Sequence, residues 1–160
     1  MGANNQAIEE SASAVLKNRL EFITHSPEQT IELGARLARQ LPQPCLLVLE
    51  GELGSGKTTL AKGIVSGLGV ARQEEVTSPS FTLVHEYGRD RKVYHADLYR
   101  IEGARELATL GLEDLLEQDA TVIVEWGEKL LDQEAEAQVR IRMELLEGDD
   151  RRVTIEGLGK

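Results

Sequence analysis

The sequence predicts one α/β domain with a mainly parallel central sheet, flanking helices and an antiparallel C-terminal edge hairpin. Two runs, residues 45–49 and 120–124, are apolar except at Thr121 and have the composition of parallel strands that are buried on both faces. A glycine-rich segment at 51–58 joins the first run to a segment with helical spacing. Residues 139–145 and 152–156 alternate between apolar and polar side chains on either side of a Gly-Asp-Asp turn, which is typical of a hairpin.

The chain has the length and composition of a single globular domain. Its 160 residues are enough for one packed core, and 41% of them are hydrophobic and 29% charged. We expect this domain to cover residues 21–160. Residues 1–20 are polar and rich in Ala, Ser and Glu, so we expect an N-terminal extension there, either an arm or a loose helix.

A short strand and a helix are expected before the first apolar run. Residues 21–24 have the composition of a short strand. Ser26 and Pro27 are typical of the N-cap and the first position of a helix, and apolar side chains within 31–41 supply its buried face. Pro42 then ends this helix.

The elements after the glycine-rich segment alternate again. Helical spacing predicts a helix over 60–68, and the patterns of 81–87 and 92–99 predict two strands. Residues 102–118 predict a further helix with a turn near Gly111, before the second buried strand.

The net charge of −10 limits the possible partners. Proteins that bind nucleic acid alone usually have a basic patch, because the neutralisation of phosphates supplies much of the affinity. Here the basic residues are scattered among more numerous carboxylates, so we expect this chain alone to bind neither DNA nor RNA. No apolar run approaches the ~20 residues that a membrane span needs, and we expect no membrane partner.

Cysteine usage favours a reducing compartment. Cys45 is the only cysteine of the chain and has no internal disulfide partner. It lies in an apolar run, so we expect a buried thiol rather than a reactive one. The first residues lack the apolar segment of a secretion signal, and we therefore predict a cytoplasmic protein.

Residues 51–58, Gly-Glu-Leu-Gly-Ser-Gly-Lys-Thr, match the P-loop pattern G-x-x-x-x-G-K-[ST] between a buried strand and a helix. Glycines let the backbone turn its N–H groups inward, and the helix N-terminus adds a positive dipole end, so the segment predicts a cradle for the phosphates of ATP. Lys57 is expected to reach the β- and γ-phosphates, and the Thr58 hydroxyl to bind Mg²⁺. The predicted nucleotide-binding residues are Leu53, Gly54, Ser55, Gly56, Lys57, Thr58 and Thr59. The alternative is an incidental glycine-rich turn.

Two carboxylates stand at the ends of predicted strands, where P-loop enzymes hold Mg²⁺ beside the P-loop. Glu125 ends the apolar run 121–124 at the carboxyl edge of the predicted sheet, the edge at which α/β proteins bind ligands. Asp97 also stands at the end of a predicted strand. For each carboxylate the other interpretation is a helix cap or a surface residue.

Other polar and aromatic residues are open to two interpretations. Residues 78–82 lie where P-loop proteins place a loop that senses the γ-phosphate, but an ordinary proline-containing turn explains them as well. Trp126 directly follows Glu125 and packs either near the nucleotide or as a core or interface anchor. His85 and His95 fall on predicted strands, and we interpret them as sheet residues rather than as a catalytic pair.

Four motifs stand in an order that closely resembles the bacterial TsaE family, the small P-loop ATPases of tRNA threonylcarbamoyladenosine (t6A) biosynthesis. They are residues 49–60, 78–84, 94–100 and 124–126, within a resemblance that runs from about Phe22 to about Ile155. The resemblance implies that Thr58 and Glu125 bind Mg²⁺ and that Asp97 is the second essential acid. The catalytic residues expected from motif and resemblance together are Lys57, Asp97 and Glu125.

The resemblance also implies protein partners. The family joins the threonylcarbamoyl transferase TsaD and its inactive homologue TsaB, and ATP binding and hydrolysis support repeated turnover. Its members do not themselves carry threonylcarbamoyl to tRNA, which agrees with the acidic charge of this chain. Residues 1–20 extend beyond the usual start of the family. The resemblance implies no roles for residues after Trp126.

Two alternative functions stay open. A small-molecule kinase would need an arginine-bearing lid and an acceptor pocket, for which 160 residues leave little room. A nucleotide-dependent switch that only binds partners would, if it used GTP, usually carry Asn-Lys-x-Asp and Asp-x-x-Gly, and the sequence contains neither. We therefore expect ATP and ADP as the nucleotides.

Overall fold

The structure is a computed structural model in which residues 9–10, 19–52, 54–77, 79, 84–102, 105, 111–126 and 138–158 are described. The strands are β1 (Glu9–Glu10), β2 (Arg19–Thr24), β3 (Cys45–Glu50), β4 (Val84–Tyr87), β5 (Lys92–Asp97), β6 (Ala120–Glu125), β7 (Gln138–Leu145) and β8 (Arg151–Glu156). The helices are α1 (Pro27–Ala38), α2 (Lys57–Gly67) and α4 (Leu112–Glu117), with a short 3₁₀ turn, η2 (Gln73–Glu75).

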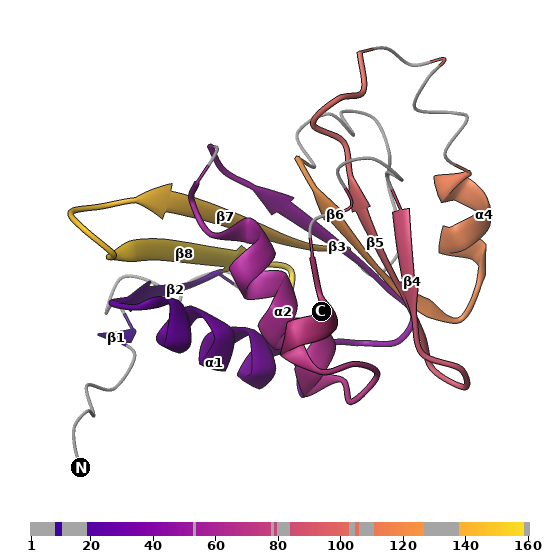
Figure 1. Ribbon diagram of the computed structural model, residues 1–160, viewed down its shortest axis with the longest axis horizontal. Coiled ribbons are helices and arrows are strands. Elements are labelled where there is room, and N and C mark those ends of the chain that lie inside the picture. Colours follow the sequence, from indigo (N-terminus) through magenta and orange to yellow (C-terminus); the bar gives the residue numbers. More distant parts are fainter. Residues whose placement is uncertain are drawn as a thin grey trace.

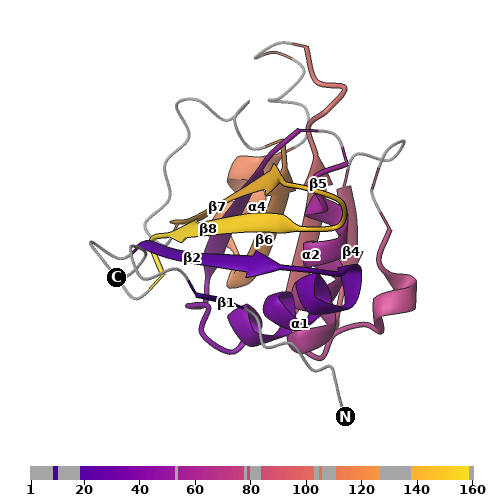
Figure 2. The same cartoon turned by 90° about the vertical axis from the view of Figure 1, so that its left-hand side faces the viewer.

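These strands form one mixed sheet in the order β1-β2-β8-β7-β3-β6-β5-β4 (Figure 1). In its centre β3 pairs parallel with β6 and β7, and β6 pairs parallel with β5. β7 and β8 form the predicted antiparallel hairpin, and β2 and then β1 pair outside it, so these two strands form that margin of the sheet (Figure 2). The predicted class, a single α/β domain with a mainly parallel centre and antiparallel flanks, is confirmed.

Helices cover the two faces of the sheet unequally. α1 and α2 lie side by side against one face (Figures 1 and 2), where Leu33 and Leu60 pack with Leu47 and Leu49 of β3. The opposite face of β3 contributes to a second apolar cluster with β5 and β6, against which Leu115 of α4 packs. β3 is therefore buried on both faces, as its unbroken apolar sequence predicts.

α1 and α2 approach each other closely because glycines stand at their contact. A Cβ atom built at Gly34 would lie 2.5 Å from the Leu60 carbonyl oxygen. A Cβ atom at Gly63 would collide with the Ile31 carbonyl oxygen. Side chains at these two positions would force the helices apart, and the position of α2 over β3 depends on this close packing.

Several local expectations can be compared with the described elements. The Ser26 hydroxyl oxygen accepts a hydrogen bond of 3.1 Å from the Gln29 amide, and Pro27 is the first residue of α1, which confirms the predicted helix start. The segment 1–20, expected to be an arm or a loose helix, instead contributes β1 and the first two residues of β2 to the sheet.

Two predicted elements lie partly outside the described residues. The strand expected over 81–87 is described from Val84 onward as β4. The helix expected over 102–118 is described at its end, where Gly111, with a φ of 68°, precedes α4. Residues 81–83, 103–104 and 106–110 are not among the described residues.

The single cysteine agrees with a further expectation. Cys45 is buried in β3, and this burial raises the pKa of its thiol to about 12. The thiol therefore stays protonated at neutral pH, as expected for an unreactive buried cysteine. No helix among the described residues is both long and apolar enough to cross a membrane.

The helix contact gives a stability prediction. Gly63→Ala should lower the free energy of unfolding by about 1–3 kcal/mol, because the added methyl group meets the α1 backbone. This direction opposes the intrinsic helix propensity, which favours alanine by about 1 kcal/mol. Urea unfolding followed by circular dichroism measures the change, with Lys62→Ala on the same helix as the control. A Gly63→Ala protein at least as stable as the wild type would contradict the close contact.

Candidate functional site

The glycine-rich segment 51–58 connects the end of β3 to the start of α2, as the motif predicts. Gly51 has a φ of 152°, and a Cβ atom there would lie 2.6 Å from the Met143 carbonyl oxygen, so the turn out of β3 requires glycine. Gly56, with a φ of 102°, is the N-cap of α2 and offers no side chain to the first-turn amides. Free amides at a helix start are available to an anion.

Lys57 is held at this helix start with its charge turned toward the loop. Its ammonium group donates hydrogen bonds to the carbonyl oxygens of Gly51 and Glu52. It also lies 4.1 Å from the ring centroid of Trp126, within cation–π distance. The side chain is 5% exposed, so its cation is held by carbonyl dipoles and an aromatic face rather than mainly by water.

Thr58 and Glu125, the two predicted metal ligands, are in contact. The Thr58 hydroxyl donates to the Glu125 carboxylate, at 2.9 Å from Oε2 and 3.1 Å from Oε1. Glu125 ends β6 and is 3% exposed, so it is a buried strand-end acid rather than a surface residue. The contact joins the sheet to the first turn of α2.

His95 of β5 is the second partner of this carboxylate. Its Nε2 atom lies 2.6 Å from Glu125 Oε2, and the side chain is fully buried. The sequence interpretation placed His95 in the sheet, where it lies, but did not connect it to the site. One signal was present: His95 and Asp97 are two positions apart on one strand and therefore face the same side.

Asp97 ends β5 directly opposite Glu125 in the parallel register of β5 and β6. Its Oδ1 atom accepts a hydrogen bond of 2.9 Å from the Tyr99 amide, so the carboxylate stabilises the turn that follows the strand. Asp97 therefore has a local structural contact as well as a place beside the other acid.

These side chains surround a cavity of about 510 Å³. It is lined by Gly54, Gly56, Lys57, Thr58, Thr59, Asp97, Tyr99, Arg100, Glu125 and Trp126. Most of the predicted site residues are thus brought together by the fold. Tyr99, Arg100 and Trp126 complete the wall, and the rings of Tyr99 and Trp126 are 4.9 Å apart.

Of the remaining predicted residues only Ser55 and Pro79 are described, and neither lines this cavity. Ser55 is buried within the loop, where its amide donates to the Glu52 carbonyl oxygen. Leu53 lies outside the described residues, as do most residues of the expected γ-phosphate loop 78–82. Of that loop only Pro79 is described, and it is buried.

The indole ring of Trp126 reaches the cavity through an unusual backbone turn. Trp126 has a φ of 61°, in the left-handed region that bulky residues seldom adopt. The turn follows Glu125 at once and places the ring beside both Lys57 and Tyr99. The ring lines the cavity and also packs against the second apolar cluster, so the structure contains features of both interpretations of this tryptophan.

The oxygen donors of the site fit a magnesium ion that is shared with a phosphate. Among the described residues no group of three or more His, Cys, Asp or Glu side chains is arranged to hold a metal. Mg²⁺ is usually bound by one or two carboxylates together with substrate phosphates and water. The hydroxyl of Thr58 and the carboxylate of Glu125, in contact at the cavity wall, are such a donor set.

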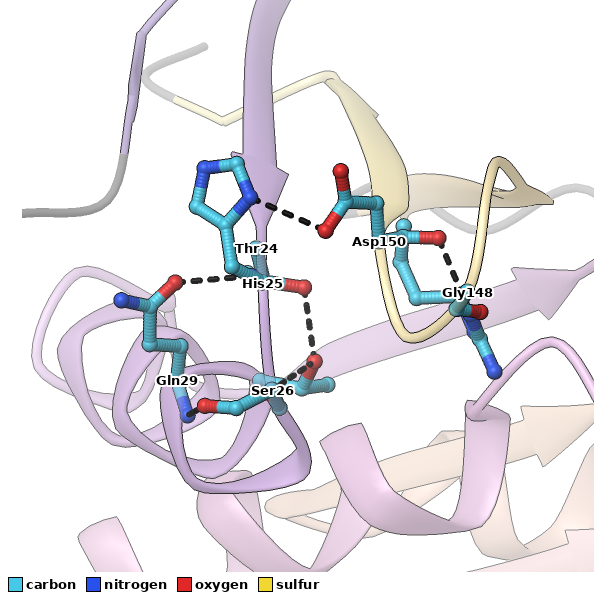
Figure 3. A network of polar contacts seen from close by, with 8 residues as sticks. Thr24, His25, Ser26, Gln29, Gly148 and Asp150 are labelled. Atoms are coloured by element: carbon cyan, nitrogen blue, oxygen red, sulfur yellow. Dashed lines mark hydrogen bonds and ion pairs between the residues drawn. The ribbon is translucent and has the colours of Figure 1, made fainter. Parts of the chain in front are cut away.

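A polar network ties the start of α1 to the turn between β7 and β8 (Figure 3). His25 Nδ1 lies 3.0 Å from Asp150 Oδ1, and the His25 amide donates to Gln29 Oε1 at 2.7 Å. The next residue, Arg151, reaches the Gly54 carbonyl oxygen at 3.5 Å. The network thus places the hairpin turn beside the glycine-rich loop.

The fold and the site define an α/β protein of the strand–glycine-rich loop–helix class. The start of the helix contacts a buried carboxylate at the end of a neighbouring strand. The family described as "Threonylcarbamoyl adenosine biosynthesis protein TsaE" matches residues 24–153. The chain belongs to the TsaE family, and the resemblance deduced from the motifs is confirmed. The family is one of t6A biosynthesis.

Individual relatives agree with this assignment. Two are named "tRNA threonylcarbamoyladenosine biosynthesis protein TsaE". That of Treponema pallidum (strain Nichols) is 32% identical over 136 residues, covering 85% of this chain and 99% of the relative. That of Streptomyces coelicolor is 40% identical over 137 residues, covering 81% and 90%. The crystal structure of Bacillus subtilis YdiB superimposes with a TM-score of 0.67 at 28% identity, over 96% of this chain and 89% of that one.

Proposed function

We propose that this chain is a slow, Mg²⁺-dependent ATPase of the cytoplasm that supports t6A modification by acting on the transferase TsaD and its homologue TsaB. One observation carries the proposal: Lys57, Thr58 and Glu125 meet at a single cavity at the end of β3. Membership of the t6A family supports the pathway, and the geometry of this cavity supports the ATPase chemistry.

Phosphate binding would use the loop, the start of α2 and Lys57. The Lys57 ammonium group donates to two neutral carbonyl oxygens and lies over an aromatic ring. A triphosphate offers anionic acceptors, and charge-assisted hydrogen bonds are roughly twice as strong as neutral ones. Lys57 would therefore exchange its loop partners for the β- and γ-phosphates, which places a positive charge where negative charge develops during transfer.

Metal binding would use the hydroxyl of Thr58 and the carboxylate of Glu125. When bound, Mg²⁺ would neutralise charge on the β- and γ-phosphate oxygens. Glu125 would supply its negative charge from a buried position, where little water competes for it. Asp97, opposite Glu125 in the register, is the acid closest at hand to orient an attacking water.

The proposal that partners control this activity rests on the family and on charge. The relatives carry the name of a tRNA biosynthesis protein, whereas a net charge of −10 opposes direct binding of tRNA. Arg100, the last residue of the motif 94–100, also lines the cavity. A further arginine supplied by a partner can be worth ~10³–10⁵ in rate, so a complex has ample scope to accelerate hydrolysis.

The nucleotide is the first point to test. We expect ATP and ADP to bind more tightly than GTP and GDP, because the sequence lacks the guanine-reading Asn-Lys-x-Asp motif. Calorimetric titration of all four nucleotides in Mg²⁺ buffer measures this order. Guanine nucleotides that bind equally well or better would contradict it.

Two substitutions separate phosphate binding from metal use. Lys57→Ala should weaken ATP binding or abolish hydrolysis, because it removes the cation nearest the loop carbonyls. Glu125→Gln should lower the Mg²⁺-dependent rate by roughly 10²-fold or more, because a neutral amide of the same shape replaces a buried charge. A coupled ATPase assay measures both, and Glu117→Gln on exposed α4 is the matched control. Normal hydrolysis by Glu125→Gln would refute the metal assignment.

The partner proposal has its own experiment. We expect the chain to co-elute with TsaD and TsaB in size-exclusion chromatography with ATP, and less so with ADP or without nucleotide. A parallel ATPase assay with and without the partners distinguishes this function from a small-molecule kinase or a purely binding switch. Failure to co-elute under every condition would count against the complex, and tight binding of bare tRNA at physiological salt would contradict the charge argument.

A further inference from the structure

The buried contact between His95 and Glu125 is not used by the steps described so far. His95 is fully buried on β5, between β6 and the edge strand β4, and its Nε2 atom lies 2.6 Å from Glu125 Oε2. A carboxylate only accepts hydrogen bonds, so Nε2 carries the hydrogen and donates it. The other ring nitrogen, Nδ1, has no hydrogen-bond partner among the described residues.

This arrangement lowers the stability of the fold, so its presence suggests a role outside stability. A buried polar group without a hydrogen-bond partner destabilises a fold, and Nδ1 of His95 is such a group among the described residues. Two other buried residues of β5 are apolar: Val93 on the same face of the sheet as His95, and Ala96 on the opposite face. Among the described residues, Nδ1 of His95 is thus without a partner, and Nε2 contacts the acid at the end of the next strand.

The Glu125 carboxylate is consequently held from two elements. Thr58 of α2 donates to it from the loop side, and His95 of β5 donates to Oε2 from within the sheet. Two donors from separate elements restrict the rotation of the side chain. A carboxylate that is oriented before the metal arrives loses less freedom when it binds, which is how outer partners of metal ligands raise affinity.

We propose that His95 is a positioning residue for the metal site: its Nε2–H group orients the Glu125 carboxylate toward Thr58 and the cavity. The proposal rests on the proposed Mg²⁺-nucleotide function and adds to it a residue that does not touch the metal or the nucleotide. The proposal gives this role to His95 and not to His85, which lies opposite it on β4. His85 is only partly buried and contacts Tyr87 instead of Glu125.

Three substitutions test this role. His95→Gln keeps an N–H donor at a reach similar to that of Nε2, whereas His95→Leu keeps the bulk and removes the donor. His85→Leu makes the same substitution on the neighbouring strand β4 and is the matched control. Each protein is titrated with β,γ-imido-ATP, a non-hydrolysable analogue, in EDTA and in Mg²⁺. The dissociation constant in EDTA divided by that in Mg²⁺ measures the coupling between metal and nucleotide.

We expect His95→Leu to lower this ratio roughly 10-fold or more, the usual effect of losing an outer hydrogen bond to a metal ligand. Its affinity in EDTA should stay within about threefold of the wild type, because the loop and Lys57 are unchanged. His95→Gln and His85→Leu should keep the wild-type ratio. Equal ratios in all four proteins, or equal losses in His95→Leu and His95→Gln, would overturn the proposal.

A spectroscopic measurement on the wild type covers the case in which His95→Leu does not fold. The chain has three histidines, so long-range ¹H–¹⁵N correlation spectra resolve each ring. We expect His95 as the Nε2–H tautomer, with an Nε2 resonance that moves when Mg²⁺ joins the bound analogue, and an unchanged His85. An Nδ1–H tautomer would overturn the contact itself. A wild-type ratio of one with the Nε2–H tautomer intact would instead refute the proposed metal function.

Discussion

The parallel pairing of β5, β6 and β3 is the constraint on which the site depends. Parallel neighbours end at the same edge of a sheet, and the register places Glu125 opposite Asp97 on one side and Leu49 on the other. β3 therefore delivers its glycine-rich loop beside both acids. If β5 or β3 ran antiparallel to β6, its carboxyl end would lie at the opposite edge of the sheet, away from Glu125. The site exists because three strand ends coincide, and no single segment of the chain contains it.

A second requirement is that α2 approach the sheet closely enough for its first turn to meet β6. The tight turn at Gly51 starts the helix directly over the end of β3. The glycine-lined contact with α1 then keeps α2 against the sheet. The outcome is a hydrogen bond between Thr58 and Glu125 at 2.9 Å, which joins helix and sheet through the two residues proposed to hold the metal. Both the stability of the fold and the geometry of the site depend on the contact between α1 and α2, so substitutions at that interface are expected to affect both.

The comparisons and the geometry answer different questions about this chain. The family assignment places it among proteins of t6A biosynthesis, but a family name does not say how its residues act. The geometry brings a lysine, a hydroxyl and two strand-end carboxylates to one cavity, which is the chemistry that a phosphate and a magnesium ion require. It also draws in Tyr99, Arg100 and Trp126, to which the motifs assign no definite role. The proposal of an ATPase that works within a complex joins these two lines of argument.

The sequence by itself determined the features that depend on neighbouring residues. These are the apolar run of β3, the glycine-rich turn, the Ser26 cap of α1 and the acid at the end of β6. Only the tertiary structure decided that His95 donates to Glu125, that Lys57 lies over Trp126, and that β2 adds to the hairpin of β7 and β8. The physical reason is that strand order and register are set by packing between distant segments. A pattern along the chain shows which face a residue occupies, but not which strand lies beside it.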